Sequence, residues 1–324
     1  MDISFLLFLQ DIRLSSGDAL TSFMVWASHF VMAYLLVVPV FIYWCLDKKK
    51  GLYILISLEC CQTVNSIIKL TVCEFRPWMK DARIIPAEGA LKEATGYAFP
   101  SGHTVAATNM YGGIACVYRN KKLLAAVCSV MLLITAFSRN FLGVHYLHDV
   151  LAAFALSCLF LYMTAKLFAY LEQHPGKEDI LLLSGVILSA VSLFYFNLKS
   201  YPMDYDASGA LIADPGEMIY EGYKVIGLFM ALCICRYIEK RFIRFECPGL
   251  TAKGVIVSVI GMLPMYLINR YLEAPFAVVF GNNVAAFLAM AVLVIHVAAV
   301  WPLVIKLVCN RGGENKKEVS ADAQ

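Results

Sequence analysis

The sequence has few charged residues and no marked excess of either sign. Only 16% of its 324 residues are charged, and the formal net charge is +3. Soluble domains carry about 25% charged residues, so the composition excludes an ordinary soluble domain. A hydrophobic content of 60% and a mean hydropathy of +0.69 indicate an all-α polytopic membrane protein. The expected surrounding is the bilayer, and no nucleic-acid partner is expected.

Other features are missing as well. The first residues lack a basic start and a small-residue cleavage site, so no cleavable signal peptide is expected. Residues 5–12 are expected to form a short amphipathic segment at the membrane surface. The eleven cysteines lie mostly in apolar runs, which favours free buried thiols over disulfides or metal ligands. There is no internal repeat.

Apolar runs long enough to cross a membrane predict a helix bundle of about nine spans. They begin near Thr21, Leu52, Ser101, Leu123, Leu147, Ile180, Tyr220, Ala252 and Val284. A turn at residues 173–177 separates five spans from four. We therefore expect a core at residues 1–172, additional helices of unknown role at 173–310, and a polar cytoplasmic tail at 311–324.

Basic loops predict the orientation of the chain. Residues 47–50, 119–122, 236–244 and 311–317 are rich in Lys and Arg, and alternation of the spans puts all four on one side. Short cytoplasmic loops carry such an excess. The N-terminus is therefore expected outside the cell membrane and the C-terminus in the cytoplasm.

Three polar segments interrupt the apolar runs of the first part. They read K-x6-R-P, P-S-G-H and S-R-x5-H-x3-D, in that order. Pro77 disfavours helix at the residue before it, so the second span should end near Arg76. Ser101 is a good N-cap for the third span, and Gly143 is placed to end the fourth. All three segments should then meet at the outward membrane face.

The residue types in these segments suit the binding and transfer of a phosphoryl group. Three cations, a helix start with a serine hydroxyl, and a glycine that admits close approach would bind phosphate oxygens: Lys69, Arg76, Arg139, Ser101 and Gly102. Asp149 lies four residues after His145, and such a carboxylate fixes the tautomer of an imidazole. There is no acidic cluster for a magnesium pair, so no metal and no cofactor are expected.

The three segments resemble the signature of the type 2 phosphatidic acid phosphatase (PAP2) superfamily. That superfamily includes lipid phosphate phosphatases, undecaprenyl pyrophosphate phosphatases of this type, glucose-6-phosphatase and vanadium haloperoxidases. The resemblance covers about residues 50–160, and it implies a PAP2-type core of about five helices, which corresponds to the expected core at residues 1–172. It also implies that His145 is the nucleophile that forms a phosphohistidine. His103 is then the general acid for the leaving oxygen and later the base that activates water.

The leading hypothesis is a membrane phosphatase that hydrolyses a lipid phosphate or pyrophosphate at the outer face. A glucose-6-phosphatase-like enzyme for a soluble sugar phosphate stays an alternative, because the span count and the Phe75–Trp78 context also resemble that enzyme. A non-catalytic phosphate-binding transporter or scaffold is a third hypothesis, and a homodimer stays open. The charges of loop 73–100, Glu93 among them, are expected to be solvated surface. His148 is expected only to neighbour Asp149, and His29 to be structural.

Overall fold

The computed structural model describes residues 2–205 and 209–310. Every regular element in this part of the chain is a helix, and the only strand-like feature there is an isolated bridge between Tyr205 and Leu211. The all-α class predicted from composition is therefore confirmed. The predicted polar tail, residues 311–324, lies outside the described residues. All eleven cysteines are free, but they are not all buried as expected, since Cys116 and Cys158 are exposed.

Clustering of contacts divides the chain into two compact units that interleave along the sequence. The first unit comprises the chain up to Leu35, Ile56–Leu167 and Ser192–Gly222, and it contains all three polar segments. The second comprises Leu36–Leu55, Phe168–Val191 and the chain from Tyr223 onward. The functional division expected near residue 172 stays a prediction.

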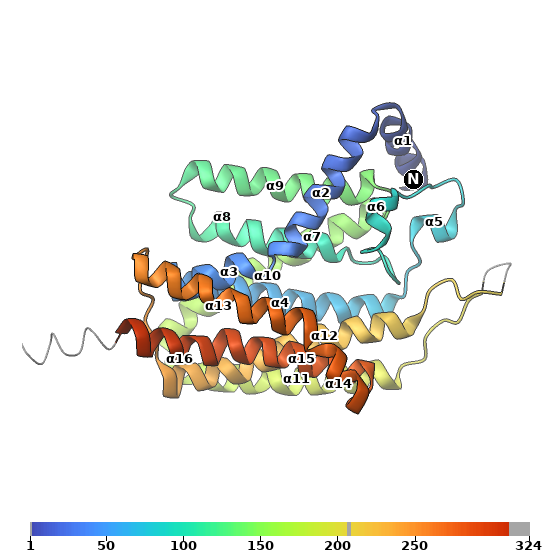
Figure 1. Cartoon of the computed structure of the whole chain (residues 1–324). Coiled ribbons are helices and arrows are strands. Elements are labelled where there is room, and N and C mark those ends of the chain that lie inside the picture. Colours follow the sequence, from blue (N-terminus) through green and yellow to red (C-terminus); the bar gives the residue numbers. More distant parts are fainter. Residues whose placement is uncertain (1, 206–208, 311–324) are drawn as a thin grey trace, which may run out of the picture. The chain divides into compact units, whose positions relative to one another are not determined.

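In the first unit, α8 and α9 lie next to each other (Figure 1). Within it, α9 packs against α7, α8 and α2, and α1 also packs against α9. Its elements are α1 (Asp2–Ser15), α2 (Asp18–Tyr34), α5 (Pro77–Lys80), α6 (Glu88–Leu91), α7 (Gly102–Ala107), η2 (Thr108–Gly112), α8 (Gly113–Val117) and α9 (Lys122–Phe141). It also includes most of α4 (Lys48–Val72) and of α10 (Leu147–Gln173).

The second unit consists mainly of long apolar helices. In it, α15 packs against both α13 and α14. Its elements are α3 (Val37–Phe41), η1 (Ile42–Leu46), η3 (Pro175–Lys177), α11 (Glu178–Leu198, up to Val191), α12 (Pro215–Ile238, from Tyr223), η4 (Glu239–Ile243), α13 (Ala252–Tyr271), α14 (Glu273–Phe280), α15 (Asn282–Ile295), η5 (His296–Val300), α16 (Trp301–Ile305) and η6 (Lys306–Asn310). None of the predicted site residues lies in this unit.

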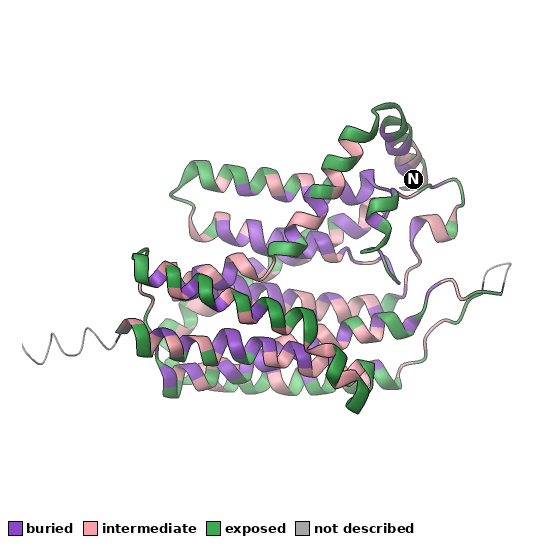
Figure 2. Ribbon diagram, in the orientation of Figure 1, coloured by how far each residue is buried: buried purple, intermediate pink, exposed green. Residues whose placement is uncertain are grey.

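The number of spans is lower than the nine expected. Among the described residues, 7 helical stretches are long and apolar enough to cross a membrane, and an eighth is added if α2 and the bent Val37–Leu46 segment form one span. The remaining stretch, Gly102–Val117, is helical as expected but shorter than a span requires. Figure 2 shows that this stretch is largely buried inside the protein, against the other helices of the unit.

Helix ends near the polar segments follow the local sequence signals. Arg76 is extended, with φ −64° and ψ 155°, as the following proline requires. Helix α4 nevertheless ends earlier, at Val72, and Cys73 then takes a positive φ of 54°. The Ser101 side chain caps α7 by accepting a hydrogen bond from the Thr104 N–H. Gly143 has φ 73°, a conformation that glycine adopts without strain, and it reverses the chain after α9.

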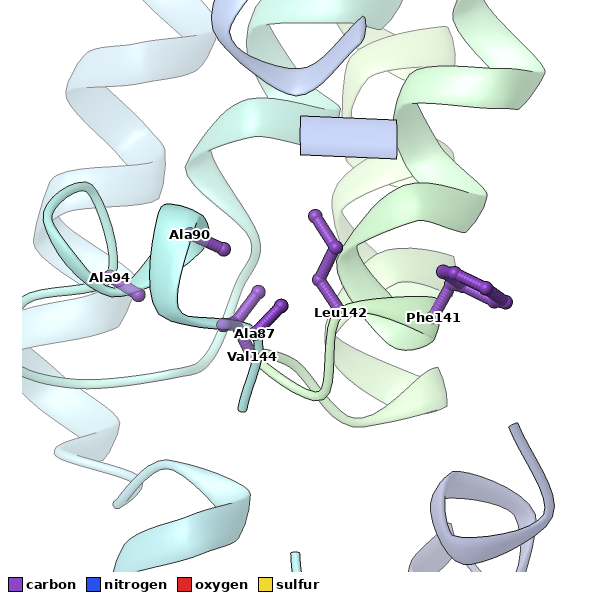
Figure 3. Packing of buried hydrophobic residues seen from close by; sticks show 6 residues of the cluster. All are labelled: Ala87, Ala90, Ala94, Phe141, Leu142 and Val144. Atoms are coloured by element: carbon purple, nitrogen blue, oxygen red, sulfur yellow. The ribbon is translucent and has the colours of Figure 1, made fainter. Parts of the chain in front are cut away.

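The loop between α5 and α7 is held by apolar packing. Ala87, Ala90 and Ala94 form a buried cluster with Leu142 and other residues at the end of α9 (Figure 3). Helix α1 adds polar contacts to the same region. The Gln10 side chain bonds Arg83 and Ile85 of the loop, and Arg13 donates to the carbonyls of Ile85 and Phe141. The loop is therefore fixed against the helix end that carries Arg139.

Candidate active site

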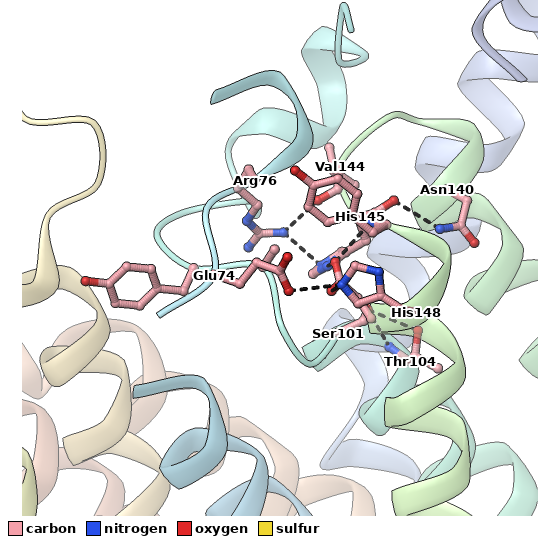
Figure 4. A network of polar contacts seen from close by, with 12 residues as sticks. Glu74, Arg76, Ser101, Thr104, Asn140, Val144, His145 and His148 are labelled. Atoms are coloured by element: carbon pink, nitrogen blue, oxygen red, sulfur yellow. Dashed lines mark hydrogen bonds and ion pairs between the residues drawn. The ribbon is translucent and has the colours of Figure 1, made fainter. Parts of the chain in front are cut away.

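His145 lies at the centre of the polar contacts (Figure 4), in the turn between α9 and α10. Its Nδ1 is 3.1 Å from Oδ2 of Asp149, and its Nε2 is 2.8 Å from Nη1 of Arg76. The ring is 1% exposed. A guanidinium can only donate, so Nε2 accepts and the ring proton lies on Nδ1. The arrangement therefore presents an unprotonated Nε2 beside a cation.

Asp149 is fixed by the start of helix α10. Its Oδ2 also accepts the backbone N–H of Tyr146, an N-terminal capping contact. Its backbone carbonyl accepts the N–H of Ser101, which joins the third segment to the second. Asn140 Nδ2 donates to the carbonyl of His145. His145 precedes α10, so the two residues do not share a helix face. The Asp149 carboxylate orients the imidazole from the first turn of α10.

Arg76 connects two loops that meet at His145. Its Nε and Nη2 donate to the carbonyls of Gly96 and Thr95, at 3.2 and 2.9 Å. Its Nη1 donates to the carbonyl of Val144 at 2.9 Å in addition to its contact with His145. Arg76 therefore holds the loop before α7 next to the nucleophile candidate, and this tie to backbone carbonyls is not visible in the motif.

The other two cations approach the site in different ways. Lys69 Nζ donates to the carbonyls of Tyr97 and Ala98, at 2.9 and 3.4 Å. Arg139 is completely buried and donates from Nη1 to the hydroxyl of Ser28. Its Nε and Nη2 have no hydrogen-bond partner among the described residues. A buried guanidinium with unpaired donors is costly unless an anion binds it, so the geometry favours Arg139 most among the predicted phosphate ligands.

The start of α7 lies beside these groups. Ser101 is fully buried, and its hydroxyl accepts from both the backbone and the side chain of Thr104. A Cβ on Gly102 would meet no atom within 4 Å, so the space at this backbone is open. The first backbone N–H groups of a helix suit an anion. Ser101 thus acts as a cap, and Gly102 leaves room for a ligand.

His103 has a carboxylate partner that the motifs did not reveal. Its Nε2 is 2.8 Å from Oε2 of Glu93, in the loop before α7. The same carboxylate oxygen is 3.5 Å from Nε2 of His29 on α2. Glu93 is exposed, as expected for this loop, but its carboxylate is also a partner of His103, and His29 is not remote from the site. No periodicity predicts a contact made by a loop residue, so the sequence offered no signal for it.

His148 also has more contacts than expected. Its Nε2 is 3.0 Å from Glu74 and 3.2 Å from Oδ1 of Asp149. The ligand atoms of these three residues lie within 4.8 Å of one another, close enough to hold a metal ion. Each carboxylate already contacts the imidazole, however, and one of the three residues orients His145. We interpret the group as a chain of polar contacts around Asp149.

The surroundings shift the pKa values of His145 and Glu93. Burial lowers the pKa of His145 well below its ordinary value, and the positive charges of Arg76 and Arg139 lower it further. Burial raises the pKa of Glu93, but the hydrogen bond and charge of His103 outweigh this, and the net shift is downward. The site therefore combines a neutral imidazole at His145 with an ionised carboxylate beside His103.

All eight predicted site residues lie in the first unit, and direct contacts link the three segments. Comparison with known proteins gives a match to the part of the chain that contains them. Residues 50–173 match the PAP2 superfamily. The chain is 25% identical over 145 residues to phosphatidylglycerophosphatase B of Bacillus subtilis (strain 168), an alignment that covers 42% of this chain and 67% of the relative. A search of solved structures found no significant match.

Proposed function

We propose that this protein hydrolyses a lipid phosphate or lipid pyrophosphate through a phosphohistidine intermediate. Through residues 50–173 the chain belongs to the PAP2 superfamily and is a phosphatase of that type. The observation that carries the proposal is the environment of His145. One ring nitrogen faces the carboxylate of Asp149 and the other faces the guanidinium of Arg76. The carboxylate suits a nucleophile that gains positive charge as it reacts, and the guanidinium keeps Nε2 unprotonated before the reaction.

In the first chemical step, the Nε2 lone pair of His145 attacks phosphorus. A bond from Nε2 to phosphorus forms, and the bond from phosphorus to the leaving oxygen breaks. His103 gives its proton to the departing oxygen. Asp149 stabilises the positive charge of the phosphorylated ring. Arg139, with its unpaired donors, and Lys69 balance the charge on the phosphoryl oxygens.

In the second step, the phosphohistidine is hydrolysed. The oxygen of a water molecule attacks phosphorus, the phosphorus–Nε2 bond breaks, and His103 takes the proton from the water. Inorganic phosphate leaves, and His145 returns to its neutral form. Since the three cations supply positive charge, the proposed reaction is independent of metal.

A cavity in the first unit supports a lipid substrate. It has a volume of about 840 Å³ and runs along α2, with Trp26, Phe30 and Tyr34 among its apolar lining residues. His29 also lines it, and His29 contacts Glu93, which contacts His103. The cavity thus reaches a partner of the catalytic groups. An acyl or prenyl chain placed there would bury apolar surface, with about 0.8 kcal/mol per buried methylene. A hexose phosphate has no such chain and would lack this contribution.

The orientation of the site is also part of the proposal. Helix α9 begins next to the basic residues 119–122 and ends at Phe141, close to Arg139 and His145. Its 20 residues span about 30 Å, the thickness of the hydrocarbon core. Because basic loops stay in the cytoplasm, the site would face the outer side of the cell membrane.

Trapping of the intermediate tests the proposed function. Purified protein is mixed with a lipid phosphate that carries radiolabelled phosphorus and is quenched within the turnover time. We expect an acid-labile, base-stable phosphoprotein in the wild type and in His103→Ala with a good leaving group, but not in His145→Ala. Phosphatidic acid, phosphatidylglycerol phosphate, undecaprenyl pyrophosphate and a hexose phosphate are then compared for phosphate release. Label on the His145→Ala variant would contradict the assigned nucleophile.

A further inference from the structure

Glu93 occupies a defined position in a packed loop. Ala90 and Ala94, which precede and follow Glu93 in the sequence, belong to the buried alanine cluster and are 0% and 3% exposed. The next two residues, Thr95 and Gly96, give their carbonyls to Arg76. Figure 3 shows Ala90 on the short helix α6 and Ala94 just beyond it, with Leu142 and Phe141 at the end of α9 nearby. The backbone around Glu93 is therefore held from both sides, which keeps its side chain within reach of α7.

The carboxylate lies between two imidazoles. Its Oε2 is 2.8 Å from Nε2 of His103 and 3.5 Å from Nε2 of His29. The side chain of His103 is 7% exposed and that of Glu93 is 34% exposed. A contact of 2.8 Å is within the range of a charge-assisted hydrogen bond. Glu93 and His103 therefore form a carboxylate–imidazole pair, as Asp149 and His145 do.

We propose that Glu93 is a positioning residue for His103, whose carboxylate accepts the Nε2–H of the ring, fixes its orientation, and stabilises the imidazolium form that donates a proton. The proposal rests on the proposed function, because it takes His103 as the acid. No new bond is made by Glu93. The proton that the leaving oxygen receives comes from His103, and the carboxylate stays ionised throughout.

The arrangement of charges is consistent with this role. Burial lowers the pKa of His103, and the guanidinium groups of Arg139 and Arg76 lower it further, whereas the hydrogen bond and charge of Glu93 raise it. Glu93 is the carboxylate in direct contact with the ring. The pKa of Glu93 is lowered on balance, so it is ionised when His103 must carry its proton. Without it, the ring would lose the charge that favours the acid form.

Leaving-group dependence provides the test. Acid catalysis matters for a poor leaving group such as the alkoxide of a lipid phosphate, and matters little for p-nitrophenolate. With Glu93→Gln we expect kcat on the lipid phosphate to fall about a hundredfold, with KM changed less than threefold, and kcat on p-nitrophenyl phosphate to fall less than about threefold. Glu93→Asp should recover part of the loss. The exposed Glu217→Gln in the same unit is the matched control and should behave as wild type.

The double variant separates a catalytic pairing from a structural role. If Glu93 acts through His103, Glu93→Gln added to His103→Asn should cause no further loss. Equal losses on both leaving groups, or multiplicative losses in the double variant, would overturn the proposal. Trapped label on Glu93→Gln with p-nitrophenyl phosphate verifies that the site is folded. If wild type releases phosphate and traps label, but Glu93→Gln has the same kcat as wild type on the lipid phosphate, only the role of Glu93 is refuted. If wild type traps no label, the proposed function fails.

Discussion

Nε2 of His145 lies 2.8 Å from Nη1 of Arg76, so the lone pair proposed to attack phosphorus accepts a hydrogen bond from a guanidinium. The contact keeps the ring neutral and directs Nε2 toward positive charge. Attack requires that Arg76 exchange this hydrogen bond for one to a phosphate oxygen. A phosphate dianion is the stronger acceptor, so substrate binding itself would free the nucleophile.

This contact leads to a prediction for pH dependence. The pKa of His145 is lowered, so its neutral, nucleophilic form persists as pH falls through about 6.5 and is lost only well below that value. For p-nitrophenyl phosphate, log kcat/KM corrected for ionisation of the substrate should stay flat from about pH 8 to about pH 6. A bend centred on about pH 6.5 would show that the ring titrates normally. The profile of Arg76→Gln, with one cation removed, should shift its acid limb to higher pH.

Arg139 should be important for activity and unfavourable for stability. Its buried guanidinium has two nitrogens without partners among the described residues, and an unpaired buried charge is destabilising. For Arg139→Met we expect kcat/KM to fall at least about a hundredfold, as for the loss of a transition-state donor. The melting temperature in detergent should be equal to or higher than that of wild type. A clear fall in melting temperature would instead indicate a structural arginine.

Chelation tests the metal-free mechanism directly. Activity should survive excess EDTA, because three cations provide the charge that a metal would supply. Vanadate should inhibit, since it adopts the five-coordinate geometry of the phosphorus in transfer. Glu74, His148 and Asp149 lie close enough to bind a metal, so the experiment is decisive for them too. Activity that is lost with EDTA and restored by magnesium would refute the mechanism.

The cavity along α2 predicts the dependence on chain length. In a homologous series of lipid phosphates, kcat/KM of the wild type should rise with chain length, and hexose phosphates should be poor substrates. Ala33 lines the cavity, so Ala33→Trp should flatten this rise while leaving a short-chain substrate nearly unaffected. Leu133→Trp, at an exposed position of α9, is the control. Efficient hydrolysis of a hexose phosphate and no effect of chain length would favour the sugar-phosphate alternative.

Cysteine labelling tests the orientation. Ala82 lies on the loop that packs near the site, and Lys121 lies in the basic turn before α9, both exposed. Ala82→Cys should react with a membrane-impermeant thiol reagent on intact cells, whereas Lys121→Cys should react only after permeabilisation. The unmodified protein gives the background from its own thiols. The reverse pattern would place the site in the cytoplasm.

Much of this protein is determined locally in the sequence. Apolar runs specify the helices, because a backbone in a bilayer must satisfy its own hydrogen bonds. Pro77 prevents helix at Arg76, Ser101 caps α7, and Gly143 reverses the chain, each as expected from the residue's own geometry. The candidate phosphate ligands and the two histidines were selected in the same way, since a motif records residue types at fixed spacing. Their roles stay predictions.

The tertiary structure alone decided which groups meet. The contact of Glu93 with His103 depends on alanines of one loop packing against the end of α9, and no spacing along the chain encodes that packing. The burial of Arg139 and its unpaired nitrogens likewise depend on α2, which supplies Ser28. The span count differed because α7–α8 is enclosed by other helices and can be short. Local signals specify where helices begin and end, whereas contacts between distant segments arise only when those helices pack.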